Sequence, residues 1–351
     1  MSRTLDEPIA GPARLRDVAE RAGVSIALVS SYINNPHKVG GRSAAKIEEA
    51  IAFLGFIPND AARQLRRGVS RMIAFVAFDV GDAFFASVSR GAQRRAAEEG
   101  LSLVLADSNG KRSTEREYLT LFGEQRVRGL LLAPVAEPSS YLDEVGLRQT
   151  RVVFIDQPAP SQRYGSVSIN DVLGGRLAAA HLLELGRRRI AYIGGPASIR
   201  QVADRLRGAR DAVREVPGAR LEVFDTQDRD TPAGRDVAYA ICRRDPRDRP
   251  DGIFCVNDNI AAGVLQVLLR HPDIRVPRDI AVVGYNDIAA DAASVIPLTS
   301  IKQPHEAFGR TAVDLLLEEF VASEQASRRQ VVFDPELVIR ESTAGDAGAV
   351  P

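Results

Sequence analysis

From residue 71 onward, short apolar runs alternate with segments of helical periodicity. Eight of these runs read as strands, at 72–78, 102–106, 129–132, 152–155, 189–193, 221–224, 252–256 and 280–283. Six intervening segments read as amphipathic helices, at 84–99, 114–125, 173–185, 203–213, 234–242 and 259–269. Strands that are apolar along their whole length are typical of parallel sheets covered by helices on both faces. The pattern therefore predicts an α/β fold built from βαβ units.

The alternation pauses in a polar segment near residues 164–170 and then resumes. We therefore expect a core of residues 71–344 made of two α/β lobes, one from about 71–166 plus 303–331 and the other from about 167–300 plus 332–344. Ligands of open α/β sheets bind beyond the carboxyl ends of the strands. Polar residues occupy such ends here, namely Asp79, Asp107, Asp156, Asn257 and Asn286.

Residues 14–57 read instead as short helices. Small or apolar side chains recur there at helical spacing, at Val18, Ala19, Ala22, Val24, Val29 and Tyr32. Gly23 allows a tight turn between two helices, which is typical of a helix-turn-helix. In that motif the second helix enters the DNA major groove, although a generic helical hairpin would show the same pattern. The side chains expected to face outward are Ser25, Ile26, Ala27, Ser30 and Ser31.

The charge is balanced over the 351 residues, with 46 Lys and Arg against 46 Asp and Glu. Residues 1–70 contain ten basic and seven acidic residues, so they carry a net +3 and the remainder carries −3. The balance therefore conceals two parts of opposite sign, and it does not exclude a nucleic-acid partner.

Several classes of protein lack support in the sequence. Cys242 and Cys255 form no CxxC pair and are interpreted as reduced core thiols, and we expect neither a metal nor a cofactor. The chain contains no P-loop, HExxH, GxSxG or Cys-His set, so we do not expect an enzyme. No apolar run is long enough for a membrane span, and residues 1–13 do not resemble a signal peptide. The expected location is the cytoplasm.

Motifs in a fixed order along almost the whole chain resemble the lactose-repressor (LacI) family of bacterial transcription regulators. They include DVAERAGVS (17–25), PNDAARQL (58–65), QRVRGLLLAP (125–134), HLLELGRRRIAYIGGP (181–196), VNDNIAAGVL (256–265) and PLTSIKQP (297–304). The resemblance implies an all-α helix-turn-helix head at 14–57 and a hinge helix at 58–70. It also implies a two-lobed core related to periplasmic sugar-binding proteins, and it leaves tails at 1–13 and 345–351.

The resemblance further implies that the head binds operator DNA. Beyond the outward-facing residues of the second helix, the implied contacts come from Asn34, Lys38, Arg42, Asn59, Ala62 and Leu65. In this family a hinge leucine, here Leu65, wedges into the minor groove and kinks the duplex. Such unstacking costs a few kcal/mol, which is offset by added contacts to the bent DNA.

The chain departs from the family on the recognition helix. Family members usually carry Thr at the position of Leu28 and Arg at that of Ser31, where the Arg reads a guanine edge. The face formed here lacks a bidentate donor for guanine but could contact thymine methyl groups through Ile26 and Ala27. We hypothesise that specificity depends more on the hinge wedge and on DNA shape than it does in relatives.

In the core, the resemblance implies an effector site between the lobes. The implied residues offer forked hydrogen bonds and aromatic faces suited to a sugar or polyol. They are Asp79, Asp82, Phe84, Phe85, Asp156, Arg205, Asn257, Asn286 and Gln303. Several could equally be structural, because Asp can cap a helix and Phe can fill a core. The segment 226–232, where relatives often place a ligand-stacking aromatic residue, contains none.

The expected function is a transcription repressor whose operator affinity is controlled by a small polar effector. The partners are operator DNA, the effector and a second copy of the chain in a homodimer. Residues 344–351 carry no leucine heptads, so we do not expect the tetramer-forming extension of the lactose repressor. The alternative is a stand-alone sugar-binding protein without DNA activity, which would need a signal peptide and would lack residues 14–67.

Overall fold

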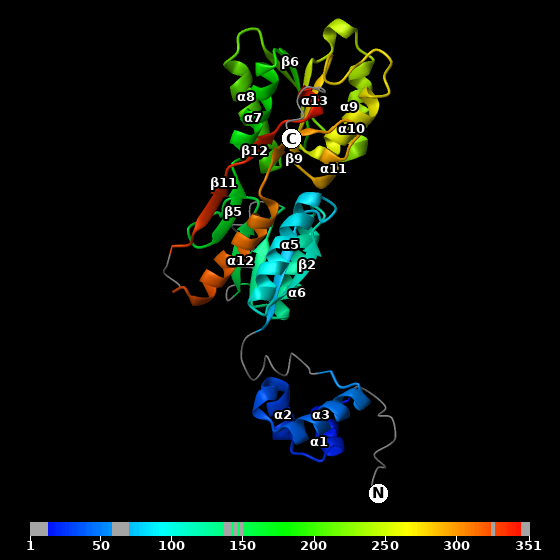
Figure 1. Cartoon of the computed structure of the whole chain (residues 1–351). Helices are drawn as coiled ribbons and strands as arrows, with labels where there is room; N and C mark the ends of the chain where they lie inside the picture. The colour runs from blue at the N-terminus through cyan, green and yellow to red at the C-terminus, as the bar shows by residue number, and fades with distance from the viewer. Residues whose placement is uncertain are drawn as a thin grey trace. The chain divides into compact units, whose positions relative to one another are not determined.

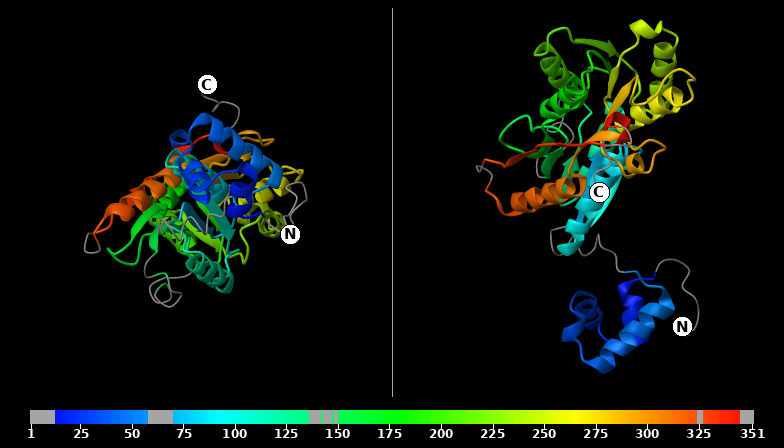
Figure 2. Two further views of the ribbon diagram at one scale, coloured as in Figure 1. Left: turned by 90° about the horizontal axis from the view of Figure 1, so that it is seen from below. Right: turned by 45° about the horizontal axis from the view of Figure 1, so that its top comes forward.

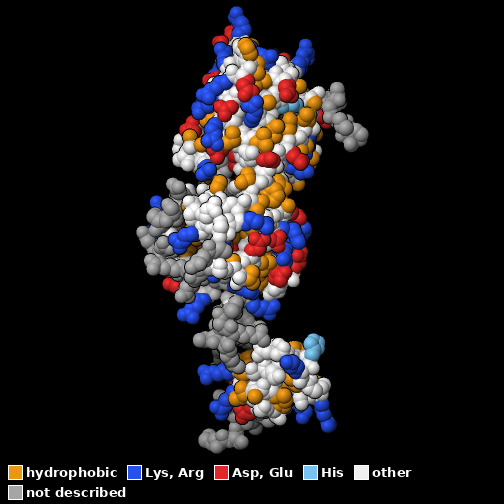
Figure 3. All heavy atoms as spheres, turned by 90° about the vertical axis from the view of Figure 1, so that its left-hand side faces the viewer, with side chains coloured by type: hydrophobic (Ala, Val, Ile, Leu, Met, Phe, Trp, Pro, Cys, Tyr) orange, Lys and Arg blue, Asp and Glu red, His pale blue; other side chains and the backbone are white. Residues whose placement is uncertain are grey.

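The computed structural model describes residues 13–57, 70–135, 142, 147, 150–323 and 327–344. The chain divides into two compact units, 1–69 and 70–351, which are considered separately below. On the face of the second unit that is visible in Figure 3, acidic and basic side chains are interspersed. None of the helices among these residues is both long enough and apolar enough to cross a bilayer.

The first unit contains the helices α1 (Leu15–Ala22), α2 (Ile26–Asn34) and α3 (Gly41–Leu54), with a 3-10 turn at Pro36–Lys38 (Figure 1). One side chain from each α-helix is completely buried at their centre, namely Val18, Val29 and Ile47. Gly23 has a φ of 63° and ends α1 in the left-handed conformation that a turn of this kind requires. The predicted helix-turn-helix is therefore present, with the expected apolar positions facing its core.

The first lobe of the second unit is built on a six-stranded sheet in the order β11-β5-β4-β3-β1-β2. All pairs in this sheet are parallel. Its strands are β1 (Met72–Ala77), β2 (Ser102–Asp107), β3 (Gly129–Leu132), β4 (Arg151–Ile155), β5 (Gly165–Ile169) and β11 (Gln330–Phe333). Helices α5 (Ala83–Glu98) and α12 (His305–Val321) pack on one face, and α6 (Arg112–Glu124) packs on the other (Figure 2).

The second lobe repeats this plan with the order β12-β10-β9-β8-β6-β7. Its strands are β6 (Arg189–Ile193), β7 (Arg220–Phe224), β8 (Gly252–Cys255), β9 (Ala281–Asn286), β10 (Thr299–Lys302) and β12 (Glu336–Val338). The main helices are α7 (Asp171–Glu184), α8 (Arg200–Arg214), α9 (Thr231–Cys242) and α10 (Asp258–Leu268). Two short helices, α11 (Ala289–Ala292) and α13 (Glu341–Ala344), complete this lobe.

The structure differs from the sequence-based expectation at the edges of both sheets. The strands β2 and β7 are not buried on both faces, because each is an edge strand with only one neighbour. The strand β12 pairs antiparallel with β10, so the second sheet is not wholly parallel. The strands β5, β10, β11 and β12 were not among the expected elements, because their apolar runs are short or interrupted by polar residues. The helix α12 was not among them either.

The chain crosses between the lobes three times, after β5, after β10 and after β11. The first sheet includes β5 as far as Ile169, beyond the expected lobe boundary at 166. At the first and third crossovers, Asn170 Nδ2 donates a hydrogen bond of 2.9 Å to Asp334 Oδ1. These crossovers are the covalent connections about which the lobes can move.

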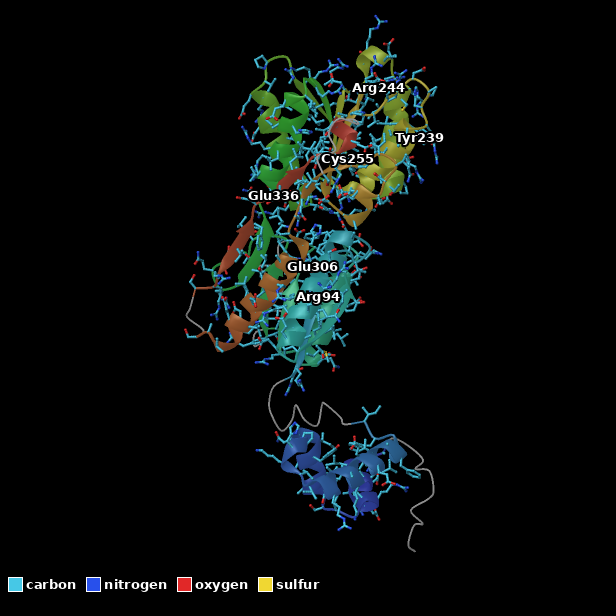
Figure 4. All side chains as sticks on the ribbon, viewed as in Figure 1. Arg94, Tyr239, Arg244, Cys255, Glu306 and Glu336 are labelled. Carbon is cyan, nitrogen blue, oxygen red and sulfur yellow. The ribbon has the colours of Figure 1, made fainter. Side chains whose placement is uncertain are left out.

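In each lobe, helices pack in pairs through a glycine on each helix that lies against the backbone of the other. We call these reciprocal glycine contacts. A Cβ on Gly91 of α5 would lie 2.2 Å from the Glu306 carbonyl oxygen, and one on Gly309 of α12 would lie 2.0 Å from that of Val88. Gly175 and Gly208 make the same kind of contact between α7 and α8, and Gly234 and Gly263 make it between α9 and α10. These contacts let the backbones touch, which only glycine permits. Beside them, Arg94 and Glu306 form an ion pair of 2.8 Å between α5 and α12 (Figure 4).

We predict that Gly208→Ala destabilises the core, because its methyl group would meet the Val172 carbonyl oxygen at 1.9 Å. Overpacking of this kind costs about 1–3 kcal/mol. Urea unfolding followed by circular dichroism measures the change in the free energy of unfolding. The matched control is Gly41→Ala, a helical glycine in the first unit with no atom within 4 Å of its added Cβ, and it should cost nothing. Equal unfolding midpoints for the two variants would contradict the close-packing argument.

Candidate functional site

A cleft between the two lobes collects polar side chains from the carboxyl ends of their strands. Its inner end has a cavity volume of about 40 Å³ and contacts Asp82, Phe84, Phe85, Asp156, Arg205, Asn257 and Asn286. Its mouth is wider, about 520 Å³, and includes Asp79. The structure thus brings eight of the nine predicted effector residues together around one cleft.

Arg205 of α8 lies at the floor of the cleft and is 8% exposed. Its Nε donates to Asp171 Oδ1 at 2.8 Å, and its Nη1 donates to the Val256 carbonyl oxygen at 2.7 Å. Its guanidinium carbon lies 3.7 Å from the centroid of the Tyr285 ring. Its Nη2 has no hydrogen-bond partner among the described residues and remains available to a ligand. Arg205 is therefore both a structural ion-pair partner and a donor toward the cleft.

Asp156 follows β4 and combines backbone strain with an unpaired oxygen. Its φ is 65°, a left-handed value that is uncommon for a residue other than glycine. Its Oδ2 accepts a hydrogen bond of 2.8 Å from Gln201 Nε2, whereas its Oδ1 is buried without a partner among the described residues. Burial and the nearby Asp171 carboxylate raise the pKa of Asp156 to about 8. At neutral pH the group is therefore mostly a protonated acid that can donate to a ligand as well as accept.

The first lobe contributes two aspartates and two phenylalanines that also have structural roles. Asp82 caps α5 by accepting from the Phe84 amide at 2.9 Å, and burial raises the pKa of its carboxyl. Asp79 Oδ1 accepts from the Gly81 amide at 2.8 Å. Phe84 and Phe85 are buried, with ring centroids 5.0 Å apart in an edge-to-face arrangement. Each of these residues therefore supports the fold and also lines the cleft.

The second lobe contributes two asparagines. Asn257 caps α10 through its Oδ1, and its Nδ2 donates to the Arg229 carbonyl oxygen at 2.8 Å. Asn286 ends β9 at a φ of 114° and is 5% exposed, and its side chain makes no hydrogen bond with another described residue. Gln303 does not line either part of the cleft. Its amide is buried on the second crossover, with both polar atoms unpaired among the described residues.

Among the residues that line the inner end of the cleft, four polar or aromatic ones were missed by the sequence analysis, namely Phe78, Gln157, Gln201 and Arg229. Gln201 crosses between the lobes and donates to the Asp156 carbonyl oxygen at 2.7 Å as well as to its side chain. Its position one helical turn before Arg205 was the available signal, since residues i and i+4 share a helix face. Arg229 lies in the segment 226–232, where the family resemblance leads us to expect an aromatic residue and not an arginine.

The helix-turn-helix presents a small and weakly polar face. Ile26 is 48% exposed, which is unusual for a large apolar side chain, and Ala27 beside it is also exposed. Ser30 and Ser31 are partly exposed on the same helix, while Lys38 and Arg42 are exposed near the start of α3. None of these side chains was predicted for the core, and none is buried there.

Two of the predicted DNA contacts have structural roles within the unit. Ser25 caps α2 by accepting a hydrogen bond of 3.2 Å from the Leu28 amide. Asn34 Nδ2 donates to the Ser30 carbonyl oxygen at 2.7 Å, although Asn34 Oδ1 is buried without a partner in the described part of the chain. The hinge residues Asn59, Ala62 and Leu65 lie outside the described residues.

A two-lobed core with a polar cleft, in one chain with a helix-turn-helix, defines a ligand-responsive DNA-binding protein. Comparison with known families matches residues 14–59 to the bacterial regulatory proteins of the lacI family and residues 179–343 to a periplasmic binding protein-like domain. The chain belongs to the lactose-repressor (LacI) family of bacterial transcription regulators. It is therefore a regulator and not an enzyme, and the match at 14–59 removes the alternative of a stand-alone binding protein.

Similar proteins include curated repressors and solved structures. The HTH-type transcriptional repressor PurR of Photobacterium profundum is 30% identical, covering 94% of this chain and 98% of the relative. The ribose operon repressor of Escherichia coli (strain K12) is 34% identical, covering 87% and 92%. The lac repressor dimer bound to operator and the anti-inducer ONPF has a TM-score of 0.80 at 27% identity, covering 95% and 100%. A complex of the regulator CelR with cellobiose has a TM-score of 0.67 at 29% identity, covering 94% and 99%.

We predict that Asp156→Asn weakens the pH dependence of core stability. Free aspartate ionises near pH 4, but Asp156 keeps its proton up to about pH 8 in the folded chain, so folding binds a proton between these values. The contribution of Asp156 to the free energy of unfolding is therefore largest below pH 4. It falls as the pH rises toward 8, by up to about 1.4 kcal/mol per pH unit. Asparagine does not titrate, so the variant should lose less stability.

Thermal unfolding between pH 5.5 and 8 measures this difference. The melting temperature of the wild type should fall by about 2 °C per pH unit more than that of the variant. Other buried acids remain in both proteins, so the difference isolates Asp156. Asp228→Asn at the exposed edge of the mouth is the matched control and should follow the wild type. Parallel slopes for Asp156→Asn and the wild type would contradict the assignment.

Proposed function

We propose that this regulator is a repressor whose operator affinity is set by a small polyhydroxylated effector bound in the cleft. The observation that carries the proposal is the set of unpaired polar groups at its inner end among the described residues, namely Asp156 Oδ1, Arg205 Nη2 and the Asn286 amide. Hydroxyl groups both donate and accept, so neighbouring hydroxyls of a sugar or polyol would satisfy all three. Phe85 offers an apolar face beside them.

Control would arise from a population shift between two arrangements of the lobes. The contact of Gln201 with Asp156 already joins the lobes across the cleft. An effector inserted there changes which arrangement is favoured by its difference in affinity for the two, commonly about 1–3 kcal/mol. An inducer lowers the affinity for the operator, whereas a corepressor raises it. An operator-binding assay with and without the effector therefore distinguishes the two.

The proposed assembly is a homodimer that binds a pseudo-palindromic operator in the cytoplasm. The edge strand β2 exposes Val104 and Leu105, at 36% and 43%, and the edge strand β7 exposes Val223, at 37%. Such edges are normally covered or charged in a monomer. A second copy placed along both edges would bury these residues, and the structurally similar lac repressor is described as a dimer.

The DNA-binding role is proposed for the small face of α2, in which Ile26 and Ala27 would contact thymine methyl groups. Lys38 and Arg42 would contact phosphates. The face contains no Arg to read guanine, so the hinge wedge and DNA shape would supply much of the specificity.

We predict that Ala27→Glu abolishes operator retention, because it places a negative charge against the DNA surface. Genomic fragments retained by the wild type in a gel shift at low salt provide the operator, and candidate sugars and polyols are then added to find one that changes the retention. The matched control is Ala52→Glu, an exposed alanine near the end of α3, which should retain the fragment. Absence of any specifically retained fragment would count against the proposed function, and equal losses for both variants would count against the α2 face.

We further predict that Leu65→Ala weakens specific operator binding much more than non-specific binding, because a minor-groove wedge contributes only where the DNA kinks. Fluorescence anisotropy with the operator and with a scrambled duplex of equal length measures both affinities. The salt dependence of non-specific binding should not change, since no phosphate contact is removed. A similar loss on both duplexes would rule out the wedge.

A further inference from the structure

Arg229 occupies the junction between the inner end and the mouth of the cleft and lines both. It lies on the loop between β7 and α9 of the second lobe, and its guanidinium carbon is 4.8 Å from the ring centroid of Phe78 in the first lobe. Its side chain makes no hydrogen bond or ion pair with any residue that the structure describes. The carboxyl groups of Asp82, Asp156 and Asp79 act on its charge from a distance, but none of them forms an ion pair with it among the described residues.

The N–H groups of the Arg229 guanidinium therefore lack hydrogen-bond acceptors among the described residues. Arg229 is partly buried, and this burial lowers its pKa because loss of hydration disfavours the charged form. A guanidinium stacked over an aromatic ring keeps its N–H groups in its own plane, where they remain free to donate. The missing acceptors must therefore come from water or from a ligand in the cleft.

The unpaired guanidinium of Arg229 favours an anionic acceptor. Arg205 is neutralised by its ion pair with Asp171. Asp156 is mostly protonated at neutral pH, and burial also raises the pKa of Asp82. Arg229 has no direct ion-pair partner of this kind among the described residues, and Asp82 and Asp79 act on its charge only from a distance. A carboxylate matches this single charge and presents two oxygens in the plane that a guanidinium recognises.

We propose that the effector carries a carboxylate that pairs with Arg229, so that it is a sugar acid and not a neutral sugar. The hydroxyl chain would lie against Asp156, Arg205 and Asn286, with the carboxylate directed toward Phe78 and the mouth. This inference rests on the proposed function, because it concerns the same cleft. A phosphate ester would bring a second negative charge that no cleft side chain among the described residues is placed to neutralise.

Isothermal titration of the full chain at pH 7 with matched compounds tests the proposal. D-gluconate is compared with D-glucitol, D-galactonate with galactitol and D-glucuronate with D-glucose, and glucose 6-phosphate represents the esters. At least one acid should bind, and its neutral counterpart should bind about tenfold or more weakly, as expected for a lost charge-assisted pair. Arg229→Gln should weaken binding of that acid by a similar factor.

The matched control is Arg163→Gln, which removes an exposed arginine that also lies near an aromatic ring, 5.9 Å from that of Tyr164, but lines neither part of the cleft. It should bind the acid as the wild type does. Binding of a neutral compound or of the phosphate ester in preference to every acid would overturn the proposal, as would failure of every acid to bind. So would equal affinity of the wild type and Arg229→Gln for the acid. A neutral compound that alters operator retention would overturn this inference while leaving the proposed function intact.

Discussion

The geometry of the cleft depends on the hydrogen bonds that the Asp171 carboxylate accepts. Its Oδ1 accepts hydrogen bonds of 2.8 Å from both Arg205 Nε and Tyr285 OH, and so it ties α7 to α8 and to β9 beneath the ligand site. Gly174 and Gly175 follow on the same helix and leave room for the Tyr285 hydroxyl and the Arg205 backbone. Loss of one partner from a buried ion pair costs about 3–5 kcal/mol. The floor of the cleft is therefore fixed, and the Nη2 of Arg205 stays without a hydrogen-bond partner among the described residues.

Reciprocal glycine contacts extend this rigidity through both lobes. Helices whose backbones touch cannot slide without a clash, so each lobe is expected to move as one body. Movement is then confined to the three crossovers and to the contacts that span the cleft. Among the described residues, those contacts include the hydrogen bonds of Gln201 to Asp156 and the cation–π contact of Arg229 with Phe78. Such an arrangement suits a regulator. The binding free energy of a small ligand can exceed that of the contacts across the cleft, but it is too small to deform a packed lobe.

Much of this architecture could be predicted from the sequence. The alternation of apolar runs and helices predicts both sheets, and the polar strand ends predict the position of the cleft. Short edge elements such as β11 and β12 escape this reasoning, because a strand of three or four residues has too few positions to show a period. The ion pair of Arg205 with Asp171 also escapes it, because the two residues are 34 positions apart and only the packing of α7 on α8 joins them. Arg229 escapes it for a different reason, because the family resemblance gives an expectation for an aromatic residue in this segment and none for an arginine.

The size of the cleft shows why ligand binding and lobe movement are coupled. Small-molecule sites usually occupy about 300–1,000 Å³, whereas the inner end here has about 40 Å³. A sugar-sized ligand that contacts Asp156 and Arg205 would therefore have to widen the inner end, and this would break the Gln201 and Arg229 contacts. The free energy of breaking them is subtracted from the intrinsic affinity, and it is recovered only if the ligand supplies equivalent partners to both side chains. A ligand with hydroxyl groups alone replaces the partners of Gln201, whereas one that also carries a carboxylate compensates Arg229, so the contacts that close the cleft also select what it binds.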